Sequence, residues 1–209
     1  LAGLKDWLAI PENQTRLELC ARGGRHWLLI SSPNQRLSVL SGEDGAELFT
    51  LPERVRLHRL SPDGNSLATI SEDWTATVWR MDNGSRARIL RGHSELLVDA
   101  QFSPDSKTVA TLDEGGCVKL WSALEGRHRL ALDHETHASG SAFNPDGTEV
   151  AVSYWDRVAR VWDTRSGQVG RVLRGGLQSL LCAAWSPDGK LIAAAGADRA
   201  VVVWSAGTG

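Results

Sequence analysis

The densest cluster of chemically capable side chains is Asp133-His134-Glu135-Thr136-His137. Imidazole nitrogens bind zinc, so His134 and His137 could hold a metal ion. A structural zinc site needs further ligands, and no cysteine or histidine pair recurs at zinc-site spacing in this chain. The alternative is that His134 has a structural role and His137 lies on a loop. The sequence favours this alternative, and we expect neither a metal nor a cofactor.

Other reactive pairs also have simpler explanations. His93-Ser94 could be a base beside a nucleophile, but it has no nucleophile elbow and no oxyanion glycines. Gly115-Gly116 and Gly175-Gly176 lack the Lys-Ser/Thr pair that follows a phosphate-binding loop. The acids of Asp113-Glu114 and Glu43-Asp44 fall in expected turns, where carboxylates are normally solvated. We therefore expect no enzymatic activity in this chain.

The segments that carry these residues repeat along the chain. Tryptophans stand 42, 41 and 42 residues apart, at Trp79, Trp121, Trp162 and Trp204. Turn sequences keep the same steps: Ser61-Pro62-Asp63-Gly64, Ser103-Pro104-Asp105-Ser106, Asn144-Pro145-Asp146-Gly147 and Ser186-Pro187-Asp188-Gly189. Two independent markers with one period indicate one supersecondary unit repeated in tandem.

The unit that ends at Trp204 shows what is repeated. Proline and glycine in Ser186-Pro187-Asp188-Gly189 suit a tight turn. Short apolar runs at 191–195 and 200–204 read as strands, and runs at 169–173 and 180–185 supply two more. No segment shows a long 3.6-residue apolar period, so the helix content should be near zero.

The first unit is a degenerate copy. Its strands are expected at 7–10, 16–20, 26–31 and 36–40, with Leu40 near the place of the closing tryptophan. The sequence therefore predicts one domain, 1–209, with five repeats at about 1–45, 46–84, 85–126, 127–167 and 168–209.

Sheets of four short strands cannot bury two apolar faces alone, but stacking them around an axis does so. The chain resembles WD-repeat propellers of bacterial type over essentially its whole length. The resemblance rests on Arg91-Gly92-His93-Ser94, Phe102-Ser103-Pro104-Asp105, Val161-Trp162-Asp163 and Trp185-Ser186-Pro187-Asp188-Gly189-Lys190. It implies an all-β propeller of four-stranded antiparallel blades, either a closed five-bladed ring or an arc of a larger one. In a closed ring, residues 7–10 would form the outer strand of the last blade.

The resemblance also implies a hydrogen-bonded set within each blade. The set comprises a histidine, a strand Ser or Thr, a turn Asp six residues before the tryptophan, and the tryptophan itself. The expected members are His93, His134, Ser153, Asp73, Asp156, Asp198, Trp79, Trp121, Trp162 and Trp204. The fullest set is expected in the fourth unit around His134 and Ser153, because Gly115 replaces the turn Asp in the third.

Residues on one rim of such a propeller, its top face, commonly contact partners in the family. Carried over to this chain, they are Glu72, Glu114, Trp155 and Ala197, and more loosely Val55, Leu97, Ala138 and Leu180. Trp155 is the strongest of these because exposed aromatic side chains anchor interfaces. The alternative is that Trp155 packs on a neighbouring blade.

The composition of the chain limits the classes of partner that it is expected to bind. The net charge is −2, from 23 basic and 25 acidic residues, so no single-sign field attracts nucleic acid or a membrane. No apolar run reaches membrane-span length. Three isolated cysteines in expected strands, Cys20, Cys117 and Cys182, predict buried thiols in a reducing compartment, the cytoplasm.

Two functions are open at this point. The first is a non-catalytic scaffold or sensor that binds a protein partner or a neighbouring domain. The resemblance and the initial Leu1 suggest a regulatory segment of a longer bacterial protein that carries a kinase, a protease or a STAND-type NTPase. The second is a propeller hydrolase with its active site in the axial channel. No histidine or carboxylate recurs at channel-facing positions, which favours the first.

Overall fold

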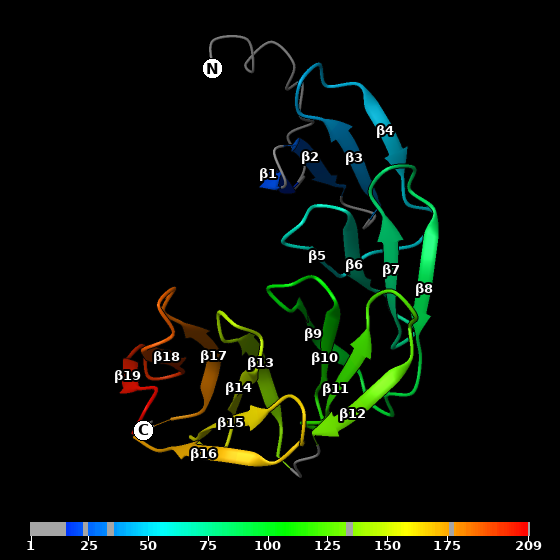
Figure 1. The fold of residues 1–209 in the computed structure, drawn as a ribbon. Coiled ribbons are helices and arrows are strands. Elements are labelled where there is room, and N and C mark those ends of the chain that lie inside the picture. Colours follow the sequence, from blue (N-terminus) through cyan, green and yellow to red (C-terminus); the bar gives the residue numbers. More distant parts are fainter. Residues whose placement is uncertain (1–15, 23–24, 33–35, 133–135, 176–177, 209) are drawn as a thin grey trace.

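The computed structural model describes residues 16–22, 25–32, 36–132, 136–175 and 178–208. These residues contain nineteen β-strands and no helix, so none of them forms a helix that could cross a membrane. The strands form five antiparallel sheets, which we call blades 1 to 5, and the blades follow one another along an arc (Figure 1). The expected all-β architecture is confirmed. The strand expected at 7–10, and with it the expected closure, lies outside the described residues.

Each blade is a meander in which neighbours in sequence pair with each other. Blade 1 consists of β1 (Arg16–Arg22), β2 (Arg25–Ser31), β3 (Leu37–Ser41) and β4 (Glu47–Thr50). Blade 2 consists of β5 (Leu57–Leu60), β6 (Ser66–Ile70), β7 (Ala76–Arg80) and β8 (Arg86–Leu90). Blade 3 consists of β9 (Leu97–Phe102), β10 (Thr108–Asp113), β11 (Val118–Ser122) and β12 (His128–Leu132).

The last two blades continue the pattern. Blade 4 consists of β13 (Ala138–Phe143), β14 (Glu149–Tyr154), β15 (Ala159–Asp163) and β16 (Val169–Leu173). In blade 5 the described strands are β17 (Leu180–Trp185), β18 (Leu191–Gly196) and β19 (Val201–Ser205). The outer strands β4, β8, β12 and β16 each fall in the sequence repeat after the one that supplies the rest of their blade. Successive repeats are therefore interlocked by backbone hydrogen bonds.

The turn between the first two strands of a blade explains the periodic Ser-Pro-Asp motif. In blade 3, Ser103 Oγ donates to Asp105 Oδ1 (2.5 Å) and accepts from the Thr108 amide (2.9 Å). Asp105 Oδ1 also accepts from the Lys107 amide (3.0 Å). In blade 5, Gly189 has φ +71°, a left-handed conformation that glycine adopts at no steric cost. The motif thus closes each turn with its own side chains.

These turns predict a pH dependence of stability. Hydrogen bonds from Ser103, Thr148 and Ser186 lower the pKa values of Asp105, Asp146 and Asp188 below their usual 3.8. A lowered pKa means that the ionised carboxylate stabilises the folded state above pH 3.8, and that this stabilisation is lost as the pH falls through the folded pKa. We expect the urea midpoint to fall as the pH drops from about 5 to about 2. A triple Asp→Asn variant at these positions should show a shallower fall, and an unchanged slope would contradict the assignment.

The core lies between the blades and not within them. In blade 3, Trp121 stands opposite Val109, and Val109 stands opposite Phe102, so one row of large side chains crosses the sheet. This row packs against Ala76 and Val78 of blade 2. Equivalent clusters fill the other three junctions, and the four periodic tryptophans are only 2–7% exposed. The period of the sequence is therefore the period of blade-to-blade burial.

Polar bonds tie the blades together along the innermost strands, which line the concave side of the arc (Figure 1). The Asp99 carboxylate is buried and accepts hydrogen bonds from the Ser141 amide (3.1 Å) and hydroxyl (3.0 Å) of blade 4. Arg59 of blade 2 lies 3.6 Å from the same carboxylate. His58 Nε2 lies 3.0 Å from Glu18 Oε2 of blade 1. Asp99 therefore links three successive blades.

Candidate functional site

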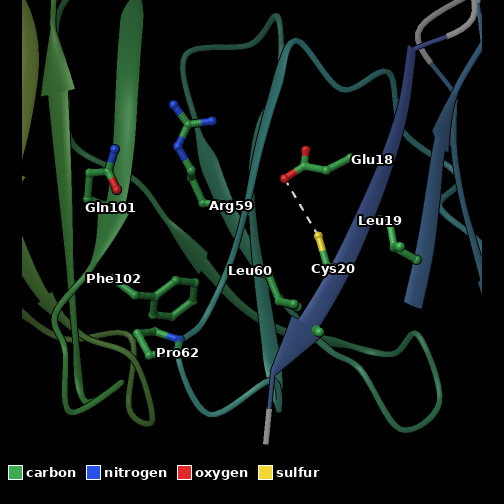
Figure 2. A pocket seen from close by; sticks show the side chains of 9 residues that line it. Glu18, Leu19, Cys20, Arg59, Leu60, Pro62, Gln101 and Phe102 are labelled. Atoms are coloured by element: carbon green, nitrogen blue, oxygen red, sulfur yellow. Dashed lines mark hydrogen bonds between the residues drawn. The ribbon is translucent and has the colours of Figure 1, made fainter. Parts of the chain in front are cut away.

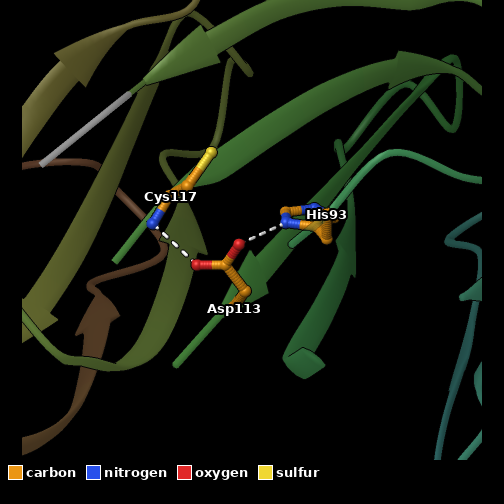
Figure 3. A group of neighbouring side chains, drawn as sticks. All are labelled: His93, Asp113 and Cys117. Atoms are coloured by element: carbon orange, nitrogen blue, oxygen red, sulfur yellow. Dashed lines mark hydrogen bonds and ion pairs between the residues drawn. The ribbon is translucent and has the colours of Figure 1, made fainter. Parts of the chain in front are cut away.

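A buried chain of hydrogen bonds crosses blade 3, and Figure 3 shows its link between Asp113 and His93. Asp113 Oδ2 lies 2.7 Å from His93 Nδ1, and His93 Nε2 lies 2.7 Å from Thr111 Oγ1. Thr111 Oγ1 also accepts from Trp121 Nε1 at 2.7 Å. The side chains of His93 and Asp113 are 1% and 2% exposed. Every member has a partner, so the network fixes the loop that enters blade 3 to the strands beneath it.

The structure corrects the expected membership of this set. The aspartate comes from the end of β10, eight residues before Trp121, and not from the turn position held by Gly115. The complete set is therefore in blade 3. The set expected in the fourth unit cannot be checked at His134, which lies outside the described residues, and Ser153 Oγ bonds to Gly140 O (3.2 Å) instead of Trp162.

Sequence reasoning missed the threonines. Trp79 Nε1 donates to Thr69 Oγ1 (2.8 Å), in the same arrangement as Trp121 and Thr111. Both threonines stand ten residues before their tryptophan, a spacing that could have revealed them. At the same spacing the fourth and fifth units carry Val152 and Ala194, which have no hydroxyl. Among the four blades that carry the periodic tryptophan, the hydrogen bond from its indole to a threonine is therefore found in blades 2 and 3.

The aspartates six residues before the tryptophans have a different role. Asp73, Asp156 and Asp198 accept hydrogen bonds from backbone amides two residues later, at 3.2, 3.2 and 3.0 Å. Asp156 also binds Arg160 at 2.7 Å. These aspartates therefore stabilise the turns between the second and third strands of their blades, and they are not part of a hydrogen-bonded set with the tryptophan.

Removing the central hydroxyl of the blade 3 network tests its contribution. Thr111→Val preserves the shape but leaves Trp121 Nε1 and His93 Nε2 without their hydrogen-bond partner, because both atoms bond to this oxygen. We expect the free energy of unfolding to fall by about 1–3 kcal/mol. Equilibrium urea unfolding would measure it. Thr77→Val, a buried threonine outside the network, is the matched control. Equal losses in both variants would contradict a specific role for the network.

His93, Asp113 and Cys117 also form a group whose possible metal-ligand atoms lie within 4.8 Å of one another. Both imidazole nitrogens are already hydrogen-bonded, and Asp113 Oδ1 accepts from the Cys117 amide (2.9 Å) (Figure 3). A cation here would have to replace bonds of the network. The geometry supports a structural hydrogen-bond set at this position.

The concave side of the arc contains a hollow of about 320 Å³ where β1, β5 and β9 meet (Figure 2). Its polar lining is Glu18, Arg59 and Gln101, and its apolar lining includes Leu60 and Phe102. Glu18 lies beside His58, and Arg59 and Gln101 both approach Asp99. Glu18 and Arg59 thus already take part in contacts between blades, which is a structural role. The hydrolase alternative would need such groups to act on a substrate instead.

The rim that carries the turns after β6, β10, β14 and β18 is the top face. In three blades these turns are anchored to the loop that enters the blade, by Glu114 N→Leu96 O, Trp155 N→His137 O and Ala197 N→Ser179 O, all 2.9 Å. The four expected contact residues at this position, Glu72, Glu114, Trp155 and Ala197, are all exposed. The side chain of Trp155 is 54% exposed.

The other four expected contact residues are not accessible. Val55, Leu97, Ala138 and Leu180 are 7%, 2%, 4% and 0% exposed. They sit at or just before the first strand of a blade and point into the clusters between blades. That part of the expected top-face site is therefore wrong. Trp74, which is 48% exposed and has φ +63°, is a second exposed tryptophan on the same rim.

Trp155 is held firmly although its ring is exposed. Its ring centroid lies 5.1 Å from that of His137, and its carbonyl accepts from Ser179 Oγ at 3.1 Å. His137 Nδ1 in turn lies 2.7 Å from Glu114 O of blade 3. The side chain therefore stands on a base built from three blades. The metal site considered for His134 and His137 falls partly outside the described residues.

The cysteines match their expectation in part. None of the three, all within the described residues, is joined in a disulfide. Cys20 and Cys117 are partly buried, but Cys182 is exposed on β17, so the expectation of three buried thiols is wrong there.

Comparison with known proteins agrees with this architecture. The family model "WD domain, G-beta repeat" matches residues 84–122, 129–163 and 167–205, together just over half of the chain. The chain is 25% identical over 180 residues to telomerase protein component 1 of Rattus norvegicus, covering 86% of this chain and 6% of that protein. It is 27% identical over 163 residues to apoptotic protease-activating factor 1 of Danio rerio, covering 74% of this chain and 12% of that protein.

A third relative is the human angio-associated migratory cell protein, 30% identical over 157 residues, which cover 56% of this chain and 36% of that protein. The chain thus spans a small part of the length of the relatives it matches. WD-repeat domains typically mediate protein–protein interactions. On the evidence of the repeated blades, the His93–Trp121 network and the matching family model, this chain belongs to the WD-repeat family.

Proposed function

We propose that this chain is a non-catalytic interaction module whose top face binds a protein partner or a neighbouring domain, with Trp155 as the anchor. The observation that carries the proposal is the exposure of a large aromatic side chain, 54% of its surface, on a backbone fixed from three blades. Rigid exposed tryptophans lose little conformational freedom on binding and bury a large area, which is why they dominate interface energies.

The surroundings of Trp155 suggest the chemistry of the partner. Other exposed residues of the same rim include the acids Glu72, Asp73 and Glu114 on blades 2 and 3, while Arg157 and Arg199 lie on the turns of blades 4 and 5. A partner segment that carries an apolar residue between charges of both signs would fit this rim. The nearly balanced charge of the whole chain, −2, agrees with a protein partner.

We further propose that the module is a regulatory segment of a longer cytoplasmic protein of bacterial type. The relatives include large proteins in which the matching part is 6–12% of the length, and one of them is named for activating a protease. The absence of disulfides in the described residues and the excess of Arg (19) over Lys (4), typical of a GC-rich genome, support this placement.

Trp155→Ala tests the proposed anchor. The ring is exposed, so the fold should tolerate the change, while binding to a top-face ligand should weaken by about 2 kcal/mol or more, roughly thirtyfold. Peptides selected from a random display library on the immobilised protein would serve as probes, with affinities measured by titration calorimetry. Leu124→Ala, 77% exposed on the opposite rim, is the matched control.

Peptides that bind both variants as tightly as the unchanged protein would contradict the top-face proposal. The hydrolase alternative has its own test, which is turnover of ester, peptide or glycoside substrates. Turnover that disappears in Glu18→Gln would favour it.

A further inference from the structure

The turns between the second and third strands of blades 2 to 5 share one backbone conformation. The residue five places before the periodic tryptophan has a positive φ, which is +63° at Trp74, +96° at Gly116, +71° at Arg157 and +67° at Arg199. Glycine adopts this left-handed conformation at no steric cost, whereas a residue with a Cβ atom is disfavoured there. Blade 3 meets the requirement with a glycine, but blade 2 holds a tryptophan at the same place.

Trp74 gains little burial in return for this backbone strain. It is 48% exposed on the top face, whereas Trp79, the periodic tryptophan of the same blade, is 2% exposed and donates its indole N–H to Thr69. Residues kept in sparsely populated backbone conformations concentrate at binding sites. An exposed aromatic side chain at such a place therefore points to a contact with another molecule.

The turn after β6 is connected to blade 3 along the top face. Arg91 Nη1 lies 3.9 Å from Asp73 Oδ2. Arg91 begins the loop 91–96 that enters blade 3, and Leu96 O at the end of this loop accepts a hydrogen bond from the Glu114 amide (2.9 Å). The surface therefore continues from the turn of blade 2 to the turn of blade 3.

The same surface reaches Trp155 on blade 4. Glu114 O lies 2.7 Å from His137 Nδ1, and the ring centroid of His137 lies 5.1 Å from that of Trp155. Trp74 and Trp155 thus stand at the two ends of one connected surface above blade 3, and the blades that carry them have neighbours on both sides (Figure 1). We call this surface the blade 3 rim, and it comprises residues 72–74, 91–96, 114–116 and 155.

The blade 3 rim carries an excess of negative charge. Its exposed charged side chains are four acids and one base: Glu72, Asp73, Glu95, Glu114 and Arg91. The base is already placed beside one of the acids, Asp73. Lys119, just outside the rim, donates its ammonium to the backbone at Gly92 O (2.8 Å). The rim is therefore complementary to a positively charged ligand.

We propose that Trp74 is a second anchor of the top-face site, and that the partner presents a basic segment of protein chain to the blade 3 rim. Two large apolar side chains of this segment pack on Trp74 and Trp155, and the lysine or arginine residues between them lie over Glu72, Glu95 and Glu114. This proposal rests on the proposed function, in which Trp155 is the first anchor. The apolar contacts supply most of the binding energy, and the opposite charges fix the register of the segment.

Trp74→Gly separates a role in binding from a role in folding. Glycine relieves the positive φ, so the urea midpoint should stay unchanged or rise. Arg199→Gly makes the same backbone change in blade 5 and is the matched control. A midpoint of Trp74→Gly that lies below that of the unchanged chain would show that the ring supports the fold, and would overturn the proposal.

Two display libraries of peptides supply the probes. Peptides in both carry Leu, Phe or Trp at two positions, separated by about two to six residues, so that the two side chains can lie up to about 24 Å apart. The residues between them are Lys, Arg, Gly or Ser in the basic library, and Asp, Glu, Gly or Ser in the acidic library. Selection on the immobilised chain should enrich the basic library alone, and titration calorimetry then measures the affinities of the enriched peptides.

The enriched peptides should bind Trp74→Gly at least about tenfold more weakly than the unchanged chain, the loss expected for one anchor. Glu72→Gln combined with Glu114→Gln keeps the shapes of both side chains, and it should weaken binding by about fivefold and reduce its dependence on salt. Leu124→Ala, on the opposite rim, should bind like the unchanged chain.

The outcomes distinguish this proposal from the one on which it rests. Binding that is lost in Trp155→Ala but unchanged in Trp74→Gly would overturn the second anchor and leave the proposed function standing. Enrichment of the acidic library would overturn the basic partner, as would a basic library without binders when a fully random library yields them. Peptides that bind both tryptophan variants as tightly as the unchanged chain would overturn both proposals.

Discussion

Trp162→Ala is expected to lower the free energy of unfolding by about 3–5 kcal/mol, the range of large aromatic truncations in a packed core. Trp162 is 5% exposed and packs with Val118 and Leu120 of the preceding blade. Alanine would leave a cavity at the junction of blades 3 and 4, and both β-sheets would have to move to fill it. Urea unfolding followed by circular dichroism, which reports strands without depending on tryptophan fluorescence, would measure the loss.

Trp155→Ala is the matched comparison for this prediction. The two tryptophans are seven residues apart in one blade, but the ring of Trp155 is 54% exposed, and we expect its loss to change stability by less than about 0.5 kcal/mol. A loss as large as that of Trp162→Ala would show that Trp155 belongs to the core. The proposed top-face anchor would then be wrong.

The features that follow the repeat were predictable from the sequence. The apolar runs at 180–185 and 191–195 coincide with β17 and nearly with β18, and the periodic tryptophans are all buried. Blade packing has the same period as the chain, so one well-marked unit describes its neighbours. The strands expected at 16–20 and 36–40 in the degenerate first unit also appear, as β1 and β3.

The predictions that proved wrong concern residues whose role depends on which side of a strand the side chain faces. Leu97 and Leu180 stand near the top rim in sequence, but strand alternation turns them into the clusters between blades. The same alternation excludes Ser153 from the hydroxyl position and selects Val152, one residue earlier, at the place of Thr111. A shift of one residue in a strand changes the face, so motif matching must follow strand register.

The polar ties along the concave side could not be predicted at all. Asp99 bonds to Ser141, 42 residues later, and neither residue type recurs at the equivalent place in the other units, which carry Leu57, Gly140 and Cys182 where blade 3 has Asp99. A period search finds what the units share, whereas this network depends on what they do not share. Only the three-dimensional arrangement brings these residues together.

Asp99→Ala should show how much that network contributes. The buried carboxylate accepts hydrogen bonds from the Ala100 amide (2.9 Å) and from the Ser141 amide and hydroxyl, and Arg59 lies 3.6 Å away. Alanine leaves these donors without an acceptor, and we expect the free energy of unfolding to fall by about 2–4 kcal/mol.

A double-mutant cycle separates the Asp99–Ser141 contact from the rest of this loss. Ser141→Ala removes the hydroxyl but keeps the amide, so it should lose less than Asp99→Ala, about 1 kcal/mol. The two changes together should cost less than their sum, since the hydroxyl bond is lost only once. Asp99→Asn keeps one oxygen acceptor and should fall between the unchanged chain and Asp99→Ala. Strict additivity in urea unfolding would mean that the two residues act independently. A loss below about 0.5 kcal/mol for Asp99→Ala would mean that apolar packing alone holds blades 2, 3 and 4 in line.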